Sequence, residues 1–289
     1  MRELKILAVV IFFTAVVYWG VEPFAHSQMH PHVAPADFTF KDLGASAKKG
    51  DAAKGAETFL SAGCTGCHGV SSQGMAAPMD NASASASFGV TPPDLSSAGA
   101  IYDKNYLAAL IKEPTKALKV EHKFNESRPH PMIAFFGLGG DIDQEVADIV
   151  AYLQSIAPVA PMNDKQVYAD ACQRCHDMKY DKFMMTTDHT SIQNYMGTLP
   201  PDLSMMIRSK GYDYLTTFIN NPQKHLEGTS MPRVGLNEKA QKQVISYMEK
   251  VGDRKKPERD SLGLKLIGYM ALFTLLAYLW KVKIWREVH

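Results

Sequence analysis

The sequence predicts an all-α protein in which two tandem copies of one helical module are flanked by N- and C-terminal transmembrane helices. Three observations lead to this fold class. Two long stretches of the chain match each other in one register, apolar residues recur at helical spacing, and an apolar run lies near each end. The 289 residues are enough for two ordinary domains and two anchors.

The first apolar run extends from Ile6 to Val21 and follows the basic residues Arg2 and Lys5. A cleavable export signal has an apolar core of about 7–15 residues and a cleavage site of small residues, and the segment after Val21 offers no such site. We therefore expect an uncleaved transmembrane helix over residues 1–22.

The second apolar run extends from Leu262 to Trp280 and is interrupted only by Lys265. It is close to the ~20 residues that a helix needs to cross a bilayer. A core helix of a soluble domain usually carries a polar face, and this run has none. The pattern predicts a transmembrane helix over residues 262–284, joined to the preceding module by a linker over residues 253–261.

Positive charges flank both runs on the side of the chain ends, and positive flanks mark the cytoplasmic side of a membrane. The flanking residues are Arg2, Lys5, Lys281, Lys283 and Arg286. Both termini are therefore expected in the cytoplasm, with residues 23–260 on the outer side. A basic cluster at 254–259 lies at the outer edge of the second run, but a translocated region of this length crosses largely regardless of such charge.

A repeat with a constant offset relates the two modules. Cys64 matches Cys172, 108 residues later (172 − 64), and the segment PPDLS at 92–96 recurs at 200–204. The same register pairs Tyr106 with Tyr214, Leu107 with Leu215, Pro114 with Pro222, Lys116 with Lys224, and Leu118 with Leu226. Beyond Leu118 the first copy carries extra residues. The body is thus divided into an arm over residues 23–47, a first module over residues 48–157 and a second module over residues 158–252.

Each module is expected to be helical with long loops. Gly50 to Cys64 is an alanine-rich helical stretch, and Asn105 to Lys112 is a short helix that ends before Pro114. The closing helix of the first module is capped by Asp141 and presents one apolar face. Its counterpart in the second module begins at Asn237. The stretch 76–100, which is rich in Ala, Ser and Pro, is expected to be a surface loop.

All four cysteines lie in two Cys-x-x-Cys-His motifs, and this pattern is typical of covalent c-type haem attachment. The two thiols add to the porphyrin vinyl groups, and the next residue places an imidazole under the iron. The motifs comprise Cys64, Cys67, His68, Cys172, Cys175 and His176. A thioredoxin-like redox pair would need a βαβ context, and a zinc site gives no reason for a histidine after both pairs. The sequence therefore predicts two covalently bound haem c groups, with His68 and His176 as iron ligands.

A second axial ligand is expected from a methionine, which raises the reduction potential of a haem. Met231 and Met132 are the candidates, because each lies just before the closing helix of its module. His130 and His122 are the alternatives to Met132, and ligation by two histidines would lower the potential instead.

Other features give weaker functional signals. His26, Met29, His30 and His32 are residue types suited to copper or zinc, but an arm packed on a neighbouring subunit is the simpler and favoured explanation. Asp94 and Asp202 belong to the repeated PPDLS, which we expect to turn the chain beside the haem. The sequence has no Gly-rich phosphate loop and no paired carboxylates for catalysis. The net charge of +1 argues against binding to nucleic acid.

Each module resembles a class I cytochrome c domain. The features that carry the resemblance are Gly55 and Phe59 before the attachment motif, the Pro-Asp-Leu loop, a methionine, and a closing helix with Tyr152 or Tyr247. It extends over roughly residues 48–252. The resemblance implies that His68 and His176 are proximal ligands and that Met132 and Met231 are distal ones.

The whole chain resembles the dihaem cytochrome c1 subunit of bacterial cytochrome bc1 complexes. The tandem modules and the C-terminal segment from Ser261, with its GLK start and its basic, tryptophan-containing end, carry this resemblance. It implies a respiratory-chain subunit of the inner membrane with periplasmic haem domains, which takes electrons from a Rieske iron–sulfur subunit to a periplasmic cytochrome c. Cytochrome b and lipid are the further implied partners, in a dimeric complex. The subunit would not be catalytic on its own.

Three alternatives remain open. A dihaem subunit of a cbb3-type oxidase also has tandem modules, but it is anchored from the N-terminal side. A dihaem peroxidase or dehydrogenase subunit would need an open coordination site on one iron. A membrane-anchored scaffold with two zinc ribbons would lack haem altogether.

Overall fold

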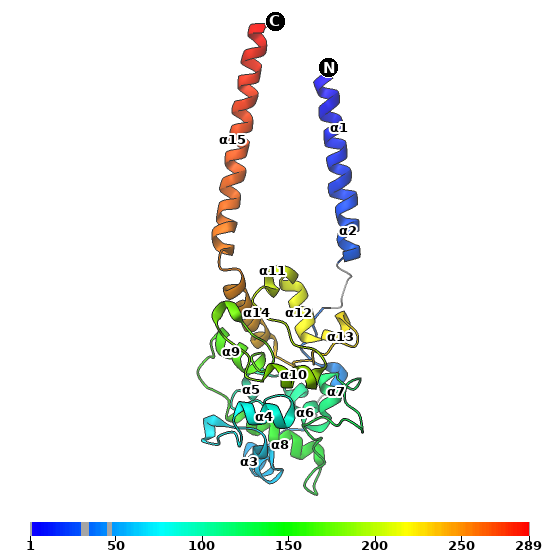
Figure 1. The fold of residues 1–289 in the computed structure, drawn as a ribbon, viewed down its shortest axis with the longest axis vertical. Helices are drawn as coiled ribbons and strands as arrows, with labels where there is room; N and C mark the ends of the chain where they lie inside the picture. The colour runs from blue at the N-terminus through cyan, green and yellow to red at the C-terminus, as the bar shows by residue number, and fades with distance from the viewer. Residues whose placement is uncertain (1, 30–34, 45–47, 289) are drawn as a thin grey trace.

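The computed structural model describes residues 2–29, 35–44 and 48–288, and within these ranges the protein is all-α, as expected from the sequence. The described residues form no strands, and their β contacts are isolated bridges such as the one between Tyr102 and Leu236. Figure 1 shows a helical body from which two long helices rise on the same side, so that both chain ends lie far from the body.

The N-terminal helix is continuous through a local widening. It consists of α1 (Arg2–Val16), a π-helical turn (Val17–Val21) and α2 (Glu22–Met29). Pro23 lies just after the turn, and a proline ring clashes with the carbonyl four residues earlier in a regular helix. The wider turn, in which the Glu22 N–H donates to the Val17 oxygen, removes that conflict. The helix therefore continues into the segment where we expected the arm to begin.

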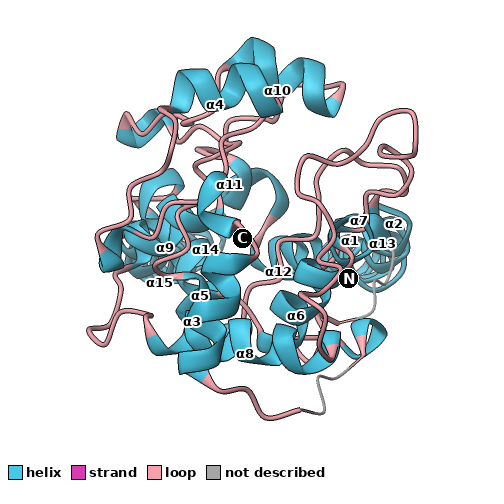
Figure 2. Ribbon diagram, turned by 90° about the horizontal axis from the view of Figure 1, so that it is seen from below, coloured by secondary structure: helices cyan, strands magenta, loops and turns pink. Residues whose placement is uncertain are grey.

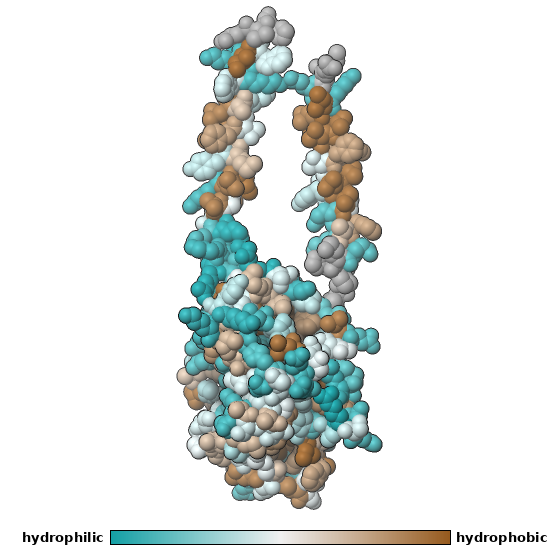
Figure 3. All heavy atoms as spheres, in the orientation of Figure 1, coloured by the Kyte–Doolittle hydropathy of each residue, from teal (hydrophilic) through white to brown (hydrophobic). Residues whose placement is uncertain are grey.

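The C-terminal helix α15 (Lys256–Val288) is longer than the 262–284 predicted from the sequence and takes in most of the expected linker. It and the segment Glu3–Gln28 are long and apolar enough to cross a membrane, and both are fully exposed. Figure 3 shows their brown, apolar side chains standing clear of the more polar body. Near the chain ends, Lys281 donates to Glu3 at 2.7 Å, which links the two helices at the same level.

The basic cluster at the start of α15 is neutralised within the chain. Lys255 pairs with Glu258, Lys256 with Glu249, and Arg259 with Asp253, while Arg254 donates to the Tyr180 carbonyl. The basic residues at 254–259, which counted against placing the body on the outer side of a membrane, are therefore bound to acceptors of the body and of α15.

The two modules repeat one order of helices. The first contains α3 (Ala52–Ser61), α4 (Asn81–Phe88), α5 (Ala98–Ile101), α6 (Lys104–Lys112), α7 (Pro114–Leu118) and α8 (Ile142–Ser155). The second contains α9 (Asp164–Ala171), α10 (His189–Met196), α11 (Met206–Lys210), α12 (Tyr212–Asn220), α13 (Pro222–His225) and α14 (Glu238–Gly252). Helices α10 and α12 begin 108 residues after α4 and α6 (189 − 81 and 212 − 104).

The prediction of a continuous surface loop at 76–100 is wrong, because this stretch contains α4 and α5. Asp80 caps α4 by accepting from the Ser83 N–H, and Ala84 and Ser85 are buried. Small and polar residues line the buried face of α4, so it has no apolar periodicity in the sequence. The burial comes from contact with α10 of the second module, which Figure 2 shows beside α4 at one edge of the body.

The first and last helices of each module cross closely. In the first module Gly55 of α3 faces α8, where a Cβ at this position would lie 1.9 Å from the Asp148 carbonyl oxygen. Phe59 and Tyr152 pack across the same crossing with ring centroids 5.4 Å apart. In the second module Tyr168 of α9 packs on Tyr247 of α14 at 4.9 Å. In each module, these contacts hold the first helix, which precedes the cysteine pair, against the last helix.

The two modules form one interface through main-chain and side-chain hydrogen bonds. The Asp103 N–H donates to the Gly235 oxygen at 3.0 Å, and the buried Tyr106 hydroxyl donates to the Arg233 oxygen at 2.9 Å. Ile101 belongs to the apolar core of the second module, although it lies on α5 of the first. The modules are therefore held in one fixed arrangement.

The segment 35–44 lies across both modules. Phe40 is buried against Tyr106, and Asp42 accepts from Arg233 of the second module at 2.7 Å and from Lys119 of the first at 3.2 Å. The Asp37 N–H donates to the Asn220 side chain at 3.1 Å. The segment 35–44 thus ties the two modules together.

Candidate functional site: two cysteine–histidine turns

The cysteine pairs lie on short turns that follow the first helix of each module. In the first module Gly63 takes a left-handed conformation (φ 72°) and leads into a 3₁₀ turn at Cys64–Gly66. The His68 N–H then donates to the Cys64 oxygen at 3.0 Å. In the second module the His176 N–H donates to the Cys172 oxygen at the same distance. Each turn therefore brings two thiols and one imidazole into a single compact loop.

The four cysteines carry free thiols. Cys67 is exposed, whereas Cys64, Cys172 and Cys175 are half-buried. Burial raises the pKa of the Cys64 thiol and raises that of Cys172 to about 12, so both stay protonated at neutral pH. The thiols are thus free and not paired in disulfides.

Each histidine ring is oriented by a proline carbonyl 25 residues later. His68 Nδ1 lies 2.9 Å from the Pro93 oxygen, and His176 Nδ1 lies 2.8 Å from the Pro201 oxygen. A carbonyl can only accept, so Nδ1 carries the proton and Nε2 is left with its lone pair. Burial lowers the pKa of both histidines, which favours this neutral tautomer. A neutral imidazole whose Nδ1 donates to a carbonyl is the usual form of a metal-binding histidine.

The repeated PPDLS loop holds the first proline carbonyl in place. Asp94 accepts from the Ser71 N–H at 3.0 Å and from its hydroxyl at 2.6 Å, and also from the Ser96 N–H at 2.8 Å. The Leu95 N–H donates to the Gly69 oxygen at 2.9 Å. Burial opposes the charge of Asp94, but the bonds from Ser71 and Ser96 outweigh it and hold the pKa of this carboxyl below its usual value. Asp94 therefore braces the loop beside His68.

The second copy repeats this bracing. Asp202 accepts from the Lys179 N–H at 3.1 Å and from the Ser204 hydroxyl at 2.8 Å. The Leu203 N–H donates to the Asp177 oxygen at 3.0 Å. The two aspartates thus position the proline carbonyls that orient the histidines. This dependence explains why PPDLS is repeated together with the cysteine motif.

Met132 and its rival His130 share one loop in the first module. His130 Nδ1 lies 3.2 Å from both the N–H and the carbonyl oxygen of Met132, and its ring packs edge-on against Phe124 at 4.9 Å. Burial lowers the pKa of His130. Met132 is half-buried, whereas His122 is exposed. The structure thus brings Met132 and His130 together on one loop and places His122 at the surface.

Met231 lies in a loop that is anchored on both sides. Its N–H donates to the Thr229 hydroxyl at 3.4 Å, and the neighbouring Ser230 hydroxyl donates to the Met196 carbonyl of α10 at 3.0 Å. Two residues further, the Arg233 N–H donates to the Leu118 oxygen of the first module at 2.9 Å. The methionine loop of the second module is thus built partly from the first.

The sequence reasoning missed several residues around these turns. Arg174 lies between Cys172 and Cys175 and faces the first module, and the buried Arg233 pairs with Asp42 of the segment 35–44. Arg174 could have been noticed as a difference between the two copies of the repeat. The register that aligns the cysteines pairs Arg174 with Gly66.

The possible metal site on the arm gains no support. His26 lies on α2, whereas His30 and His32 lie outside the described residues. Among the residues that the structure describes, no three His, Cys, Asp or Glu side chains gather in a way that could hold a metal ion.

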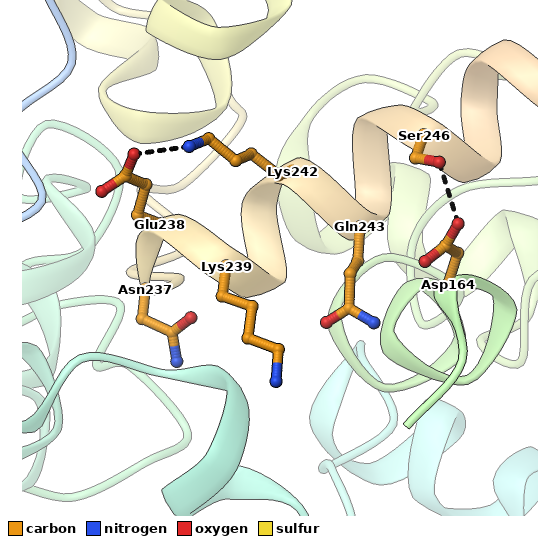
Figure 4. A pocket seen from close by; sticks show the side chains of 7 residues that line it. All are labelled: Asp164, Asn237, Glu238, Lys239, Lys242, Gln243 and Ser246. Carbon is orange, nitrogen blue, oxygen red and sulfur yellow. Dashed lines mark hydrogen bonds and ion pairs between the residues drawn. The ribbon is translucent and has the colours of Figure 1, made fainter. Parts of the chain in front are cut away.

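An open surface depression lies away from both cysteine turns, between α9 and the start of α14 (Figure 4). Its lining is polar, and four of the side chains form pairs: Lys242 donates to Glu238 at 2.7 Å, and the Ser246 hydroxyl donates to Asp164 at 2.8 Å. It includes none of the residues expected to carry chemistry.

Comparison with known proteins bears on the first module. The family model for cytochrome c matches residues 52–157, which include Cys64, Cys67 and His68. No curated protein and no solved structure matches the chain. The donor set agrees with the family, because two free thiols and an oriented neutral imidazole are the groups that covalent haem attachment uses. The chain therefore contains a cytochrome c domain over residues 52–157, which implies covalently bound haem c and a role as an electron carrier.

Proposed function

We propose that the protein is a membrane-anchored dihaem cytochrome, with one haem held by each module. The observation that carries this proposal is the recurrence of the histidine geometry: His68 with Pro93 and His176 with Pro201 have the same separation in sequence and nearly the same distance. When bound, the haem iron supplies reversible one-electron transfer. Cys64 and Cys67 attach the first group, and Cys172 and Cys175 attach the second.

Met132 and Met231 are the proposed sixth ligands. A thioether ligand raises the reduction potential, which suits a carrier late in an electron-transfer chain. The anchoring of the Met231 loop to Met196 and Leu118 supports this role, since a ligand loop must hold its side chain in one place. With both axial positions closed, neither haem site would bind a small substrate.

We propose that the two terminal helices anchor the chain in a bacterial inner membrane, with both termini in the cytoplasm and the modules in the periplasm. The basic flanks of both helices support this orientation. The ion pair between Glu3 and Lys281 agrees with it, because it requires the two ends to lie on the same side.

Within this arrangement the protein acts as the cytochrome c1 subunit of a bc1-type quinol:cytochrome c oxidoreductase. It takes electrons from a Rieske iron–sulfur subunit, is bound to cytochrome b in a dimeric complex, and delivers electrons to a periplasmic cytochrome c. The support is the resemblance of the C-terminal helix and of the tandem modules to that subunit. The protein contributes the positions and potentials of its haems, not a catalytic group.

A second candidate is the dihaem subunit of a cbb3-type oxidase, which the N-terminal helix favours. That helix is a continuous span over Glu3–Gln28 in this protein. The C-terminal span over Lys256–Arg286 argues against it, since that family is anchored from the N-terminal side.

A redox titration of the intact complex with quinol as the donor tests the proposal. The expected result is two c-type components in the reduced-minus-oxidised spectrum, both reduced by quinol, with a Rieske protein and cytochrome b in the purified complex. One c-type component would contradict the dihaem assignment. A haem–copper oxidase subunit in place of the Rieske protein would favour the second candidate.

The ligand assignment is tested separately by Met132→His and Met231→His. Each variant should lower the potential of one component and change its spectrum, because a second imidazole replaces a thioether. An unchanged component would show that the methionine of that module is not a ligand. His130→Ala is the matched control for Met132 and should leave the potential of the first component unchanged.

A further inference from the structure

Arg174 lies on the cysteine turn of the second module at the point where this turn contacts the first module. Its carbonyl oxygen accepts from the Thr187 N–H at 3.3 Å. The Thr187 hydroxyl, in turn, accepts from the Thr91 N–H at 3.1 Å and lies 3.2 Å from the Thr91 hydroxyl. Both threonines are buried. The main chain of Arg174 is thus held against the first module.

The Arg174 side chain also faces the first module. The Arg174 guanidinium lies beside the hydroxyl of Tyr102 and near Tyr106, and both tyrosines belong to the first module. Burial raises the pKa of Tyr102, and the positive charge of Arg174 reduces this rise. Its Nε is buried and makes no hydrogen bond within the described part of the chain. Asp170, an acidic residue at this interface, accepts from the Ser97 hydroxyl instead. Arg174 is therefore a partly buried cation without a carboxylate partner among the described residues.

A partly buried cation without a counter-ion is costly, because burial removes water and nothing replaces it. The planar guanidinium fork is well suited to a carboxylate, which it can bind with two parallel hydrogen bonds. A covalently attached haem carries two propionate carboxylates. A propionate would supply the counter-ion that the described residues do not.

The repeat shows that this cation belongs to one module only. The matching position in the first module is Gly66 (174 − 108), which is exposed and has no atom within 4 Å of an added Cβ. Both the Arg174 cation and the Asp94 carboxylate act on the His68 ring, whereas the charged groups acting on His176 are the carboxylates of Asp177 and Asp202. Among these charges, the cation acts on His68.

We propose that Arg174 of the second module binds a propionate of the haem attached at Cys64 and Cys67, and that its positive charge makes this haem the higher-potential one. This inference rests on the proposed function, since it assumes one haem in each module. A positive charge near the iron disfavours the more positive, oxidised state and so raises the potential. Electrons then run from the His176 haem to the His68 haem.

The direction of transfer agrees with the shape of the molecule. In Figure 1 the second module, with α11, α12 and α14, lies nearer the two long helices, and α3 and α8 of the first module lie at the far end. A membrane-bound donor would thus deliver to the second module, and a soluble acceptor would collect from the first.

A redox titration of the full chain, purified in mild detergent, tests the proposal with three variants. Arg174→Gln removes the charge, and Arg174→Lys keeps the charge but cannot donate two parallel hydrogen bonds. Arg208→Gln is the matched control, because Arg208 is an exposed arginine of the same module. The double variant Cys64→Ala/Cys67→Ala removes the first attachment site and so identifies which component belongs to the first module.

We expect Arg174→Gln to lower the potential of the component that the double cysteine variant lacks, and to leave the other component in place. Arg174→Lys should shift the same component in the same direction by less, and Arg208→Gln should shift neither. The proposal is overturned if both Arg174 variants leave that component unmoved, or if the shift falls on the component that survives the cysteine replacement. Failure of the dihaem assignment has a different signature, because the unmodified chain would then titrate as one component.

Discussion

His176 Nδ1 lies 2.8 Å from the carbonyl oxygen of Pro201, and the first module repeats this relationship between His68 and Pro93 at 2.9 Å. In both modules the proline belongs to a loop that an aspartate braces through backbone N–H groups. The histidine is thus fixed by a hydrogen bond whose acceptor is itself held by other hydrogen bonds. Such second contacts set both the orientation and the basicity of a metal ligand.

Replacing the bracing aspartate should loosen the histidine. Asp94→Ala removes the acceptor for the Ser71 and Ser96 N–H groups, and because the site is exposed we expect a loss of about 1 kcal/mol in unfolding free energy. A weaker bond from His68 to Pro93 makes the imidazole less basic and raises the potential of that haem. Thermal unfolding and redox titration measure the two effects. Glu57→Ala, on the exposed face of α3, is the control, and equal behaviour of both variants would refute the bracing role.

The ion pair between Asp42 and Arg233 should make stability depend on pH. Burial opposes the charge of Asp42, but Arg233 and Lys119 outweigh it and hold the pKa of this carboxyl below its usual value. A carboxyl with a lowered folded-state pKa stabilises the protein above the unfolded-state pKa of about 4, and this contribution is lost as the pH falls through the folded-state value.

Because the Asp42 side chain is nearly half exposed and water screens the pair, Asp42→Asn should reduce stability at pH 7 by about 0.5–1 kcal/mol and flatten the decline below about pH 4. Thermal unfolding of the full chain from pH 3 to pH 7 measures this. Glu126→Gln, an exposed carboxylate on a loop of the first module, should leave the profile unchanged. If the stability of Asp42→Asn depended on pH as steeply as that of the wild type, the ion pair between Asp42 and Arg233 would contribute nothing to the pH dependence.

The close crossing of α3 and α8 should not tolerate a side chain at Gly55. A Cβ there would lie 1.9 Å from the Asp148 carbonyl oxygen and 2.9 Å from the Tyr152 Cβ. The backbone of α3 or α8 would therefore have to move. Overpacking of this kind costs roughly 1–3 kcal/mol, and more where backbone is the obstacle, so Gly55→Ala should lower the unfolding temperature clearly. Gly263→Ala on α15 is the control, since nothing lies within 4 Å, and there alanine should be neutral or stabilising. Equal unfolding temperatures for the two variants would contradict the crossing.

The Tyr106 hydroxyl should contribute to the contact between modules. It donates to the Arg233 oxygen at 2.9 Å, and burial raises its pKa, so it stays protonated and remains a donor. Tyr106→Phe leaves a buried carbonyl without its partner, at a cost of about 1–3 kcal/mol. Denaturant unfolding detects the loss. Tyr180→Phe, an exposed tyrosine of the second module, should have no effect, and a matching result for Tyr106→Phe would exclude the interface role.

Some elements could be predicted because their signals are local. The closing helices have capping aspartate or asparagine and an apolar stripe, and Asp141 and Asn237 do cap them in the structure. Helix α4 was missed because its buried face consists of residues such as Ala84 and Ser85, which become a packing surface only against the other module. The extension of the long N-terminal helix past Pro23 was missed because proline usually ends a helix. The π-helical turn that accommodates the proline has no recognisable sequence pattern.

The sequence by itself determined the attachment turns, the repeat, the all-α class and the two long apolar helices. Haem attachment needs three residues within five positions, and a membrane span needs only a long apolar stretch. Both signals therefore lie within one short or continuous segment of the sequence and can be recognised without the fold. The tertiary structure decided the rest: which carbonyl orients each histidine, how segment 35–44 ties the modules, and that Arg174 faces its neighbour. These depend on contacts between residues 25 to 191 positions apart, which form only when two unequal copies pack together.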